Sequence, residues 1–132
     1  IFVDPDKWDE NFTDQWNTQL YRQAQRYPNL PLSSKVKGVV SLYDVSDDWI
    51  PIYDKSSLSG FYMAVGSSGN QYKNAPIAGV MMAQLIEQCE KGHDHDKDPV
   101  KLHLKYINRE IDIGFYSRNR VINSESSMSV LG

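Results

Sequence analysis

Residues 61–79 read FYMAVGSSGNQYKNAPIAG and carry more structural information than any other part of the chain. An apolar strand pattern runs directly into a loop of small residues, and the loop leads into a helical pattern. Such a loop directs unpaired backbone N–H groups, together with the positive end of the helix dipole, toward one point. That place suits an anion or an electron-rich heteroatom of a cofactor. A second interpretation stays open at this point: a tight turn in which Gly66 and Gly69 only permit unusual backbone angles.

The helix after the loop has clear ends. Pro76 stands where a first-turn proline belongs, and Gly92 is placed to end the helix. Nearly every residue from 77 to 86 is apolar. A helix that is apolar all round is expected to be buried on several sides.

The rest of the chain predicts an α+β fold. Apolar residues recur every three or four positions over residues 9–27, which predicts a long amphipathic helix. Short turns separate the first strand patterns, including one at residues 55–60, so we expect an antiparallel sheet with a helix against it. The strand patterns lie at residues 36–43, 49–53 and 61–65 and, more weakly, at 101–107 and 111–116.

Composition argues against several classes of partner. The 132 residues carry a net charge of −3 with no basic stripe, which argues against binding to nucleic acid. No apolar run approaches the roughly 18–20 residues of a membrane span, so we expect no membrane association. The single cysteine, Cys89, cannot form an intramolecular disulfide and is predicted to pack on its helix. A reducing, cytoplasmic location is therefore expected.

Three polar groups invite functional interpretation. The run His93-Asp94-His95-Asp96 resembles a metal-ligand cluster, but its place in a charged linker favours a solvated loop, so no metal site is predicted. Four aspartates could supply paired carboxylates for acid–base chemistry. Of these, Asp47 and Asp48 read more simply as turn residues, whereas Asp44 and Asp54 stay open. Arg118, Asn119 and Arg120 could bind a phosphate, although a surface anchor is the favoured interpretation.

Three blocks of the sequence resemble the C-terminal part of FAD-dependent amine and amino-acid oxidoreductases of the D-amino-acid oxidase superfamily. The sarcosine oxidase, glycine oxidase and dimethylglycine dehydrogenase branch is the most similar in appearance. Residues 43–52, YDVSDDWIPI, resemble that family's Thr-Pro-Asp strand–turn–strand. Residues 61–73 resemble its Gly-x-Ser-Gly-His-Gly-Phe-Lys flavin loop, and residues 76–86 resemble the following helix. The resemblance extends from about residue 8 to residue 132 and is specific at the loop and helix.

The resemblance implies an enzyme that oxidises the C–N bond of a secondary amine or amino acid to an imine. The backbone of residues 67–71 would face the pyrimidine edge of the flavin and stabilise negative charge there. Lys73 matches the family's loop lysine and would contact the flavin or the substrate carboxylate, which makes it the catalytic candidate. The implied cofactor-binding residues are Gly66, Ser67, Ser68, Gly69, Asn70, Gln71, Tyr72 and Lys73.

The chain also departs from the family pattern. Asn70-Gln71 stands where the family often has His-Gly, so any proton-handling role of that histidine is absent. No cysteine occurs near Ser41, where some members tether FAD. The dinucleotide fingerprint Gly-x-Gly-x-x-Gly is missing. We therefore expect a missing N-terminal half to complete the flavin domain, and the chain alone to be inactive and without FAD.

The implied organisation is a substrate-domain helix and antiparallel sheet over residues 1–60, a strand–loop–helix of a split FAD-binding domain over 61–92, and a linker and C-terminal extension over 93–132. Two other functions stay open. The chain could be a non-catalytic domain that forms a homodimer or binds a partner through its apolar helix. It could also belong to a family member that serves as a tRNA-modifying or electron-transfer subunit.

Overall fold

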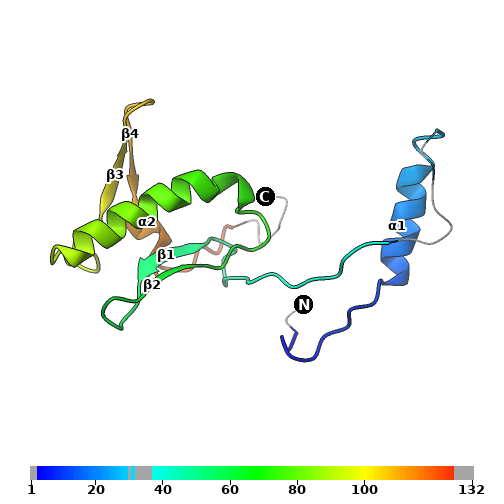
Figure 1. Ribbon diagram of the computed structural model, residues 1–132, viewed down its shortest axis with the longest axis horizontal. Coiled ribbons are helices and arrows are strands. Elements are labelled where there is room, and N and C mark those ends of the chain that lie inside the picture. Colours follow the sequence, from blue (N-terminus) through cyan, green and yellow to red (C-terminus); the bar gives the residue numbers. More distant parts are fainter. Residues whose placement is uncertain (1–2, 30, 32–36, 127–132) are drawn as a thin grey trace. The chain divides into compact units, whose positions relative to one another are not determined.

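The computed structural model describes residues 3–29, 31 and 37–126, and the chain divides into two compact units, Ile1–Leu42 and Tyr43–Gly132. The described elements are two α-helices, two short 3-10 helices and two antiparallel hairpins (Figure 1). The predicted α+β class is confirmed at this level. Neither of the described helices has the length and apolarity needed to cross a membrane.

The first unit contains helix α1, Asp14–Ala24, which is 11 residues long. The side chain of Thr13 caps it by accepting a hydrogen bond from the Trp16 N–H at 3.1 Å. The prediction of a long helix over residues 9–27 is therefore wrong in length, because the cap fixes a later start. The strand predicted over residues 36–43 is also wrong where the structure describes it, since residues 37–43 belong to no strand and residue 36 lies outside the described residues.

The second unit begins with a hairpin of β1, Ile52–Lys55, and β2, Tyr62–Val65. The strands pair antiparallel, with Tyr53 opposite Ala64, so the predicted turn between them is confirmed. The strand predicted over residues 49–53 is displaced, because Trp49 has a φ of 61° in a turn and β1 starts only at Ile52. Each residue of β2 is half-buried or exposed.

Helix α2, Ala75–Glu90, begins with proline in its first turn, as predicted. Gly92 follows its C-terminus with a φ of 92°, so the expected terminal glycine is confirmed. Only Met81 and Leu85 of this helix are buried, and Val80 on another face is 50% exposed. The expectation that α2 is buried on several sides is therefore wrong for the described chain.

A second hairpin, β3 (Lys101–Leu104) and β4 (Arg109–Asp112), follows α2 and leads into the 3-10 helix η2, Ile113–Tyr116. The strand predicted at 101–107 is shortened to β3 by the turn that follows Leu104. The strand predicted at 111–116 is displaced, because β4 starts two residues earlier and residues 113–116 form η2. The two hairpins form separate two-stranded sheets rather than one sheet. Cys89 packs against the core, as predicted. The buried core residues are Tyr53, Met81, Leu85, Val100, Leu102 and Ile113.

Candidate functional site

The loop at residues 66–71 joins β2 to a short 3-10 helix, η1 (Tyr72–Asn74), which continues into α2. Gly66, Ser68 and Gly69 all have positive φ values, of 70°, 51° and 74°. A Cβ atom on Gly69 would lie 2.7 Å from the ring of Tyr43, so a side chain is excluded there by space as well as by backbone angle. The predicted need for unusual backbone angles is confirmed.

Asp44 holds this loop in shape. Its Oδ2 accepts hydrogen bonds from the N–H groups of Gly66 at 2.7 Å and Ser67 at 3.0 Å, and its Oδ1 accepts one from the Ser67 hydroxyl. The Ser68 N–H donates to the Asp44 carbonyl at 2.9 Å. Partial burial opposes ionisation of Asp44, but the hydrogen bonds from Ser67 and Gly66 outweigh it and lower the pKa of the carboxyl. The structure thus gives Asp44 a positioning role.

This arrangement changes which backbone donors are available to a ligand. The N–H groups of Ser67 and Ser68 are used by Asp44, and the N–H of Asn70 donates to the Ser67 carbonyl at 3.1 Å. The expectation that residues 67–71 all present their backbone to a ligand is therefore wrong for these three. Within the described part of the chain, four N–H groups of the loop and of η1, all before α2, donate no hydrogen bond, namely those of Gly69, Gln71, Tyr72 and Lys73.

Side chains and a cavity complete the surroundings of the loop. Lys73 is exposed and forms no ion pair with any residue that the structure describes, and Tyr72 is 97% exposed. A cavity of about 250 Å³ lies beside the loop and has mostly apolar walls. It is lined by Pro51, Tyr53, Ala64, Val65, Ser67, Gln71, Ala75 and Ala78.

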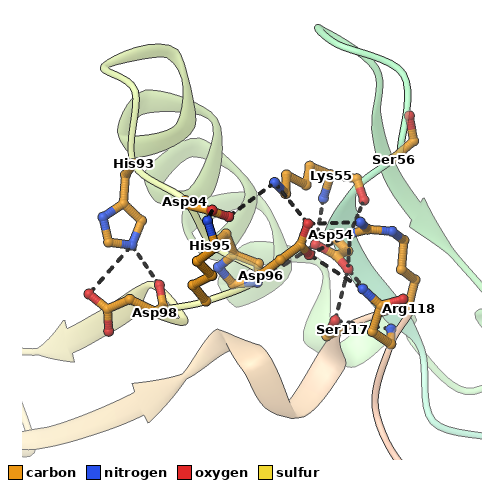
Figure 2. Close-up of polar contacts among 12 residues, drawn as sticks. Asp54, Lys55, Ser56, His93, Asp94, His95, Asp96, Asp98, Ser117 and Arg118 are labelled. Carbon is orange, nitrogen blue, oxygen red and sulfur yellow. Dashed lines mark hydrogen bonds and ion pairs between the residues drawn. The ribbon is translucent and has the colours of Figure 1, made fainter.

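A second polar cluster lies around Asp54, which is fully buried in β1 (Figure 2). Its Oδ2 accepts hydrogen bonds from the Ser117 hydroxyl at 3.0 Å, the Arg118 N–H at 2.8 Å and the Arg118 guanidinium at 3.0 Å. Its Oδ1 accepts the Lys55 N–H at 2.7 Å. With so many donors around it, Asp54 is a structural carboxylate that fastens the segment after η2 to β1.

Arg118 joins a third segment to this cluster. Its guanidinium makes two hydrogen bonds to the carboxylate of Asp96, at 2.9 and 3.0 Å, and Lys55 forms an ion pair with the same carboxylate at 2.9 Å. Hydrogen bonds from Arg118 first, and from Lys55, lower the pKa of Asp96 to about 2. Because Arg118 is occupied by two carboxylates, the anchor interpretation holds for it and the phosphate interpretation does not.

His95 is buried beside the same cluster. Its Nδ1 accepts a hydrogen bond from the Val100 N–H at 2.9 Å, so the proton of the neutral ring resides on Nε2. Nε2 has no hydrogen-bond partner among the described residues and lies 3.6 Å from Asp54 Oδ1. The prediction of a solvated loop over residues 93–96 is therefore wrong for His95. No group of three or more metal-ligating side chains occurs in the described ranges.

Asp48 and Arg120 form a separate buried ion pair. Arg120 Nη2 and Nε donate to the Asp48 carboxylate at 2.6 and 3.0 Å, and these hydrogen bonds lower the pKa of Asp48 well below its usual range. Asp48 is therefore more than the turn residue that was predicted, whereas Asp47 is exposed in the turn. Both arginines of the 118–120 segment thus anchor it to carboxylates of residues 48–54.

The structure brings the predicted loop residues together as one contiguous segment, and it adds residues that the sequence did not indicate. The sequence indicated Asp44 only as an acid–base candidate, and it carried no signal for the hydroxyl of Tyr53, which donates to Gln71. Comparison of the chain with protein-family models, with curated proteins and with solved structures gave no match.

Proposed function

We propose that this chain is the C-terminal part of a FAD-dependent oxidoreductase that oxidises the C–N bond of a secondary amine or amino acid to an imine. One observation carries the proposal: the N–H groups of Gly69, Gln71, Tyr72 and Lys73, in the loop and the 3-10 helix η1 that lead into the 16-residue helix α2, donate no hydrogen bond to a described residue. Such donors favour an electron-rich edge on which negative charge develops. The resemblance of residues 61–86 to a flavin loop and helix supplies the identity of that ligand.

The surroundings of the loop fit one end of a flavin. A flat ring system with an apolar body and polar edge suits the apolar-walled cavity of about 250 Å³ beside the loop. Gly69 is exposed, and the Tyr43 ring covers the side on which a Cβ atom would lie. When bound, the flavin would accept a hydride from the carbon next to the amine nitrogen. The fit covers one end of the cofactor, so in this proposal the other contacts would come from the N-terminal part of the parent protein.

Lys73 has the role of a cationic contact in this proposal. It is exposed, unpaired within the described chain and adjacent to the unused N–H groups. A lysine at a helix N-terminus is opposed by the helix dipole, so an anionic partner would stabilise it. The carboxylate of an amino-acid substrate, or the reduced flavin, supplies that charge.

The test uses the full-length parent protein. We expect a visible flavin spectrum after purification or after addition of FAD, and a parent that stays colourless would refute the proposal. The substitution Lys73→Met is then expected to raise KM for a carboxylated amine by about tenfold, the effect of losing one charged hydrogen bond. The matched control is Lys91→Met, which removes the same charge at the other end of α2 and should leave KM unchanged.

A second function is favoured by the exposed apolar face of α2. Val80 is 50% exposed and Ile86 is 36% exposed on this helix. A non-catalytic chain could associate with a copy of itself or with the missing N-terminal half through this face. Light scattering on the purified chain tests association with a second copy, because a monomer at high concentration counts against self-association.

A further inference from the structure

Two residues that line the cavity beside the loop, Tyr53 and Gln71, take part in a series of hydrogen bonds that runs from the core to the loop. It starts at Tyr53, a core residue of β1 that is only 5% exposed and whose ring packs against Tyr116 with centroids 5.2 Å apart. The Tyr53 hydroxyl donates to Gln71 Oε1 at 3.2 Å. Burial first, and the neighbouring Tyr116 second, raise the pKa of Tyr53, so its hydroxyl stays protonated and able to donate.

The orientation of the Gln71 amide follows from its partners. Asn74 Nδ2 also donates to Gln71 Oε1, at 2.9 Å, so this oxygen accepts two hydrogen bonds. The amide nitrogen of Gln71 must then face the other way, where it donates to Asn70 Oδ1. Because its oxygen faces Gln71, the Asn70 amide turns its Nδ2 group away from Gln71. No described residue accepts from that group.

We infer that Tyr53 is a positioning residue for the loop ligand, and that through Gln71 it fixes the Asn70 amide as a side-chain donor. The inference rests on the proposed function for the identity of the ligand, and it adds a residue and a direction of hydrogen bonding to that site. The Asn70 donor lies in the same loop as the unused N–H groups, so the site selects a hydrogen-bond acceptor or an anion. In the flavin proposal, that acceptor is the edge of the ring that becomes negative on reduction.

The first test needs no cofactor. Tyr53→Phe removes the hydroxyl but keeps the ring against Tyr116. In the chain itself, this variant should shift the side-chain NH₂ resonances of Asn70 and Gln71 in the NMR spectrum. Those resonances are assigned with the variants Asn70→Asp and Gln71→Glu. The matched control is Tyr62→Phe, which removes a hydroxyl bonded to Glu90 at 2.7 Å from the neighbouring strand. Unchanged Asn70 and Gln71 resonances in Tyr53→Phe would overturn the inference.

The second test uses the full-length parent with bound FAD. Tyr53→Phe should shift the reduction potential of the flavin to more negative values, because the Asn70 amide that donates to the reduced ring is no longer fixed in place, while Tyr62→Phe should leave the potential unchanged. Gln71→Met, which removes the linking amide, should shift the potential in the same direction. A constant potential in both variants, with the amide resonances moved, would overturn the positioning role. A parent that binds no FAD overturns the proposed function instead, and the resonances still decide whether Tyr53 orients the amides.

Discussion

The Asp48–Arg120 ion pair gives the most decisive test of what holds the second unit together. The two side chains are 0% and 9% exposed, and the guanidinium donates twice to the carboxylate. Arg120 also donates to the carbonyls of Ile50 at 2.8 Å and Ser117 at 3.1 Å. The substitution Arg120→Met keeps an apolar stem of similar length but removes all of these hydrogen bonds.

The expected cost follows from the burial of the pair. Removing one partner of a buried ion pair destabilises a protein by about 3–5 kcal/mol, because the other charge stays desolvated and uncompensated. Asp48 keeps the N–H groups of Ile50 and Asn123 as donors, which favours the lower end of that range, about 3 kcal/mol. A domain is stable by only about 5–15 kcal/mol, so the loss would be a large part of the total.

Urea unfolding followed by circular dichroism measures this loss. The double variant Asp48→Asn/Arg120→Met should be more stable than Arg120→Met alone, since it leaves no buried charge while Asn can still accept from the Ile50 N–H. The control Lys91→Met breaks an exposed ion pair with Glu87 and should leave the midpoint unchanged. A loss below about 1 kcal/mol for Arg120→Met would mean that the pair behaves like a surface salt bridge, and the reasoning would be refuted.

Two further predictions concern His95 and Gly69. Burial lowers the pKa of His95 below its ordinary value of 6.5, against the opposing attraction of Asp54, so the unfolded state binds the proton more readily. The contribution of His95 to the free energy of unfolding should thus be fully present above pH 6.5 and should decrease as the pH falls below that value. The urea midpoints at pH 8 and pH 5.5 should therefore differ less in His95→Gln than in the unmodified chain. Gly69→Ala should cost about 1–3 kcal/mol, because it combines a φ of 74° with a clash against Tyr43. Gly79→Ala, in open space on α2, should instead be stabilising by about 0.5–1 kcal/mol, and thermal melts of both variants compare them.

Local patterns in the sequence predicted local structure well. The loop at residues 66–71, the proline at the start of α2 and the glycine after it act on neighbouring backbone, so their effects can be read from adjacent residues. The hairpin of β1 and β2 was likewise indicated by two apolar segments around a turn. Boundaries were less accurate because single contacts, such as the Thr13 cap, decide where an element begins.

Long-range polar contacts could not be predicted in the same way. Asp48 and Arg120 are separated by 72 positions, and nothing in the local sequence of either indicates the other. His95 looked solvated because its neighbours are charged, yet its ring is buried by the return of the chain at Val100. Burial of this kind depends on tertiary packing, which composition and periodicity do not encode at a single position.

Three aspartates of residues 44–54 share one physical role, and this limits the chemistry available to the second unit. Asp44 holds the loop, Asp48 holds Arg120 and Asp54 holds Arg118. The hydrogen bonds to Asp44 and Asp48 lower the pKa of these two carboxyls and favour their charged form. A carboxylate stabilised in this way is a weak base, since taking up a proton would break the hydrogen bonds that hold a later segment in place. Asp44 and Asp48 are therefore poorly suited to acid–base chemistry. In the proposed oxidoreductase, the described chain contributes backbone donors, an oriented amide and the charge of Lys73, and the bond-breaking chemistry belongs to the flavin.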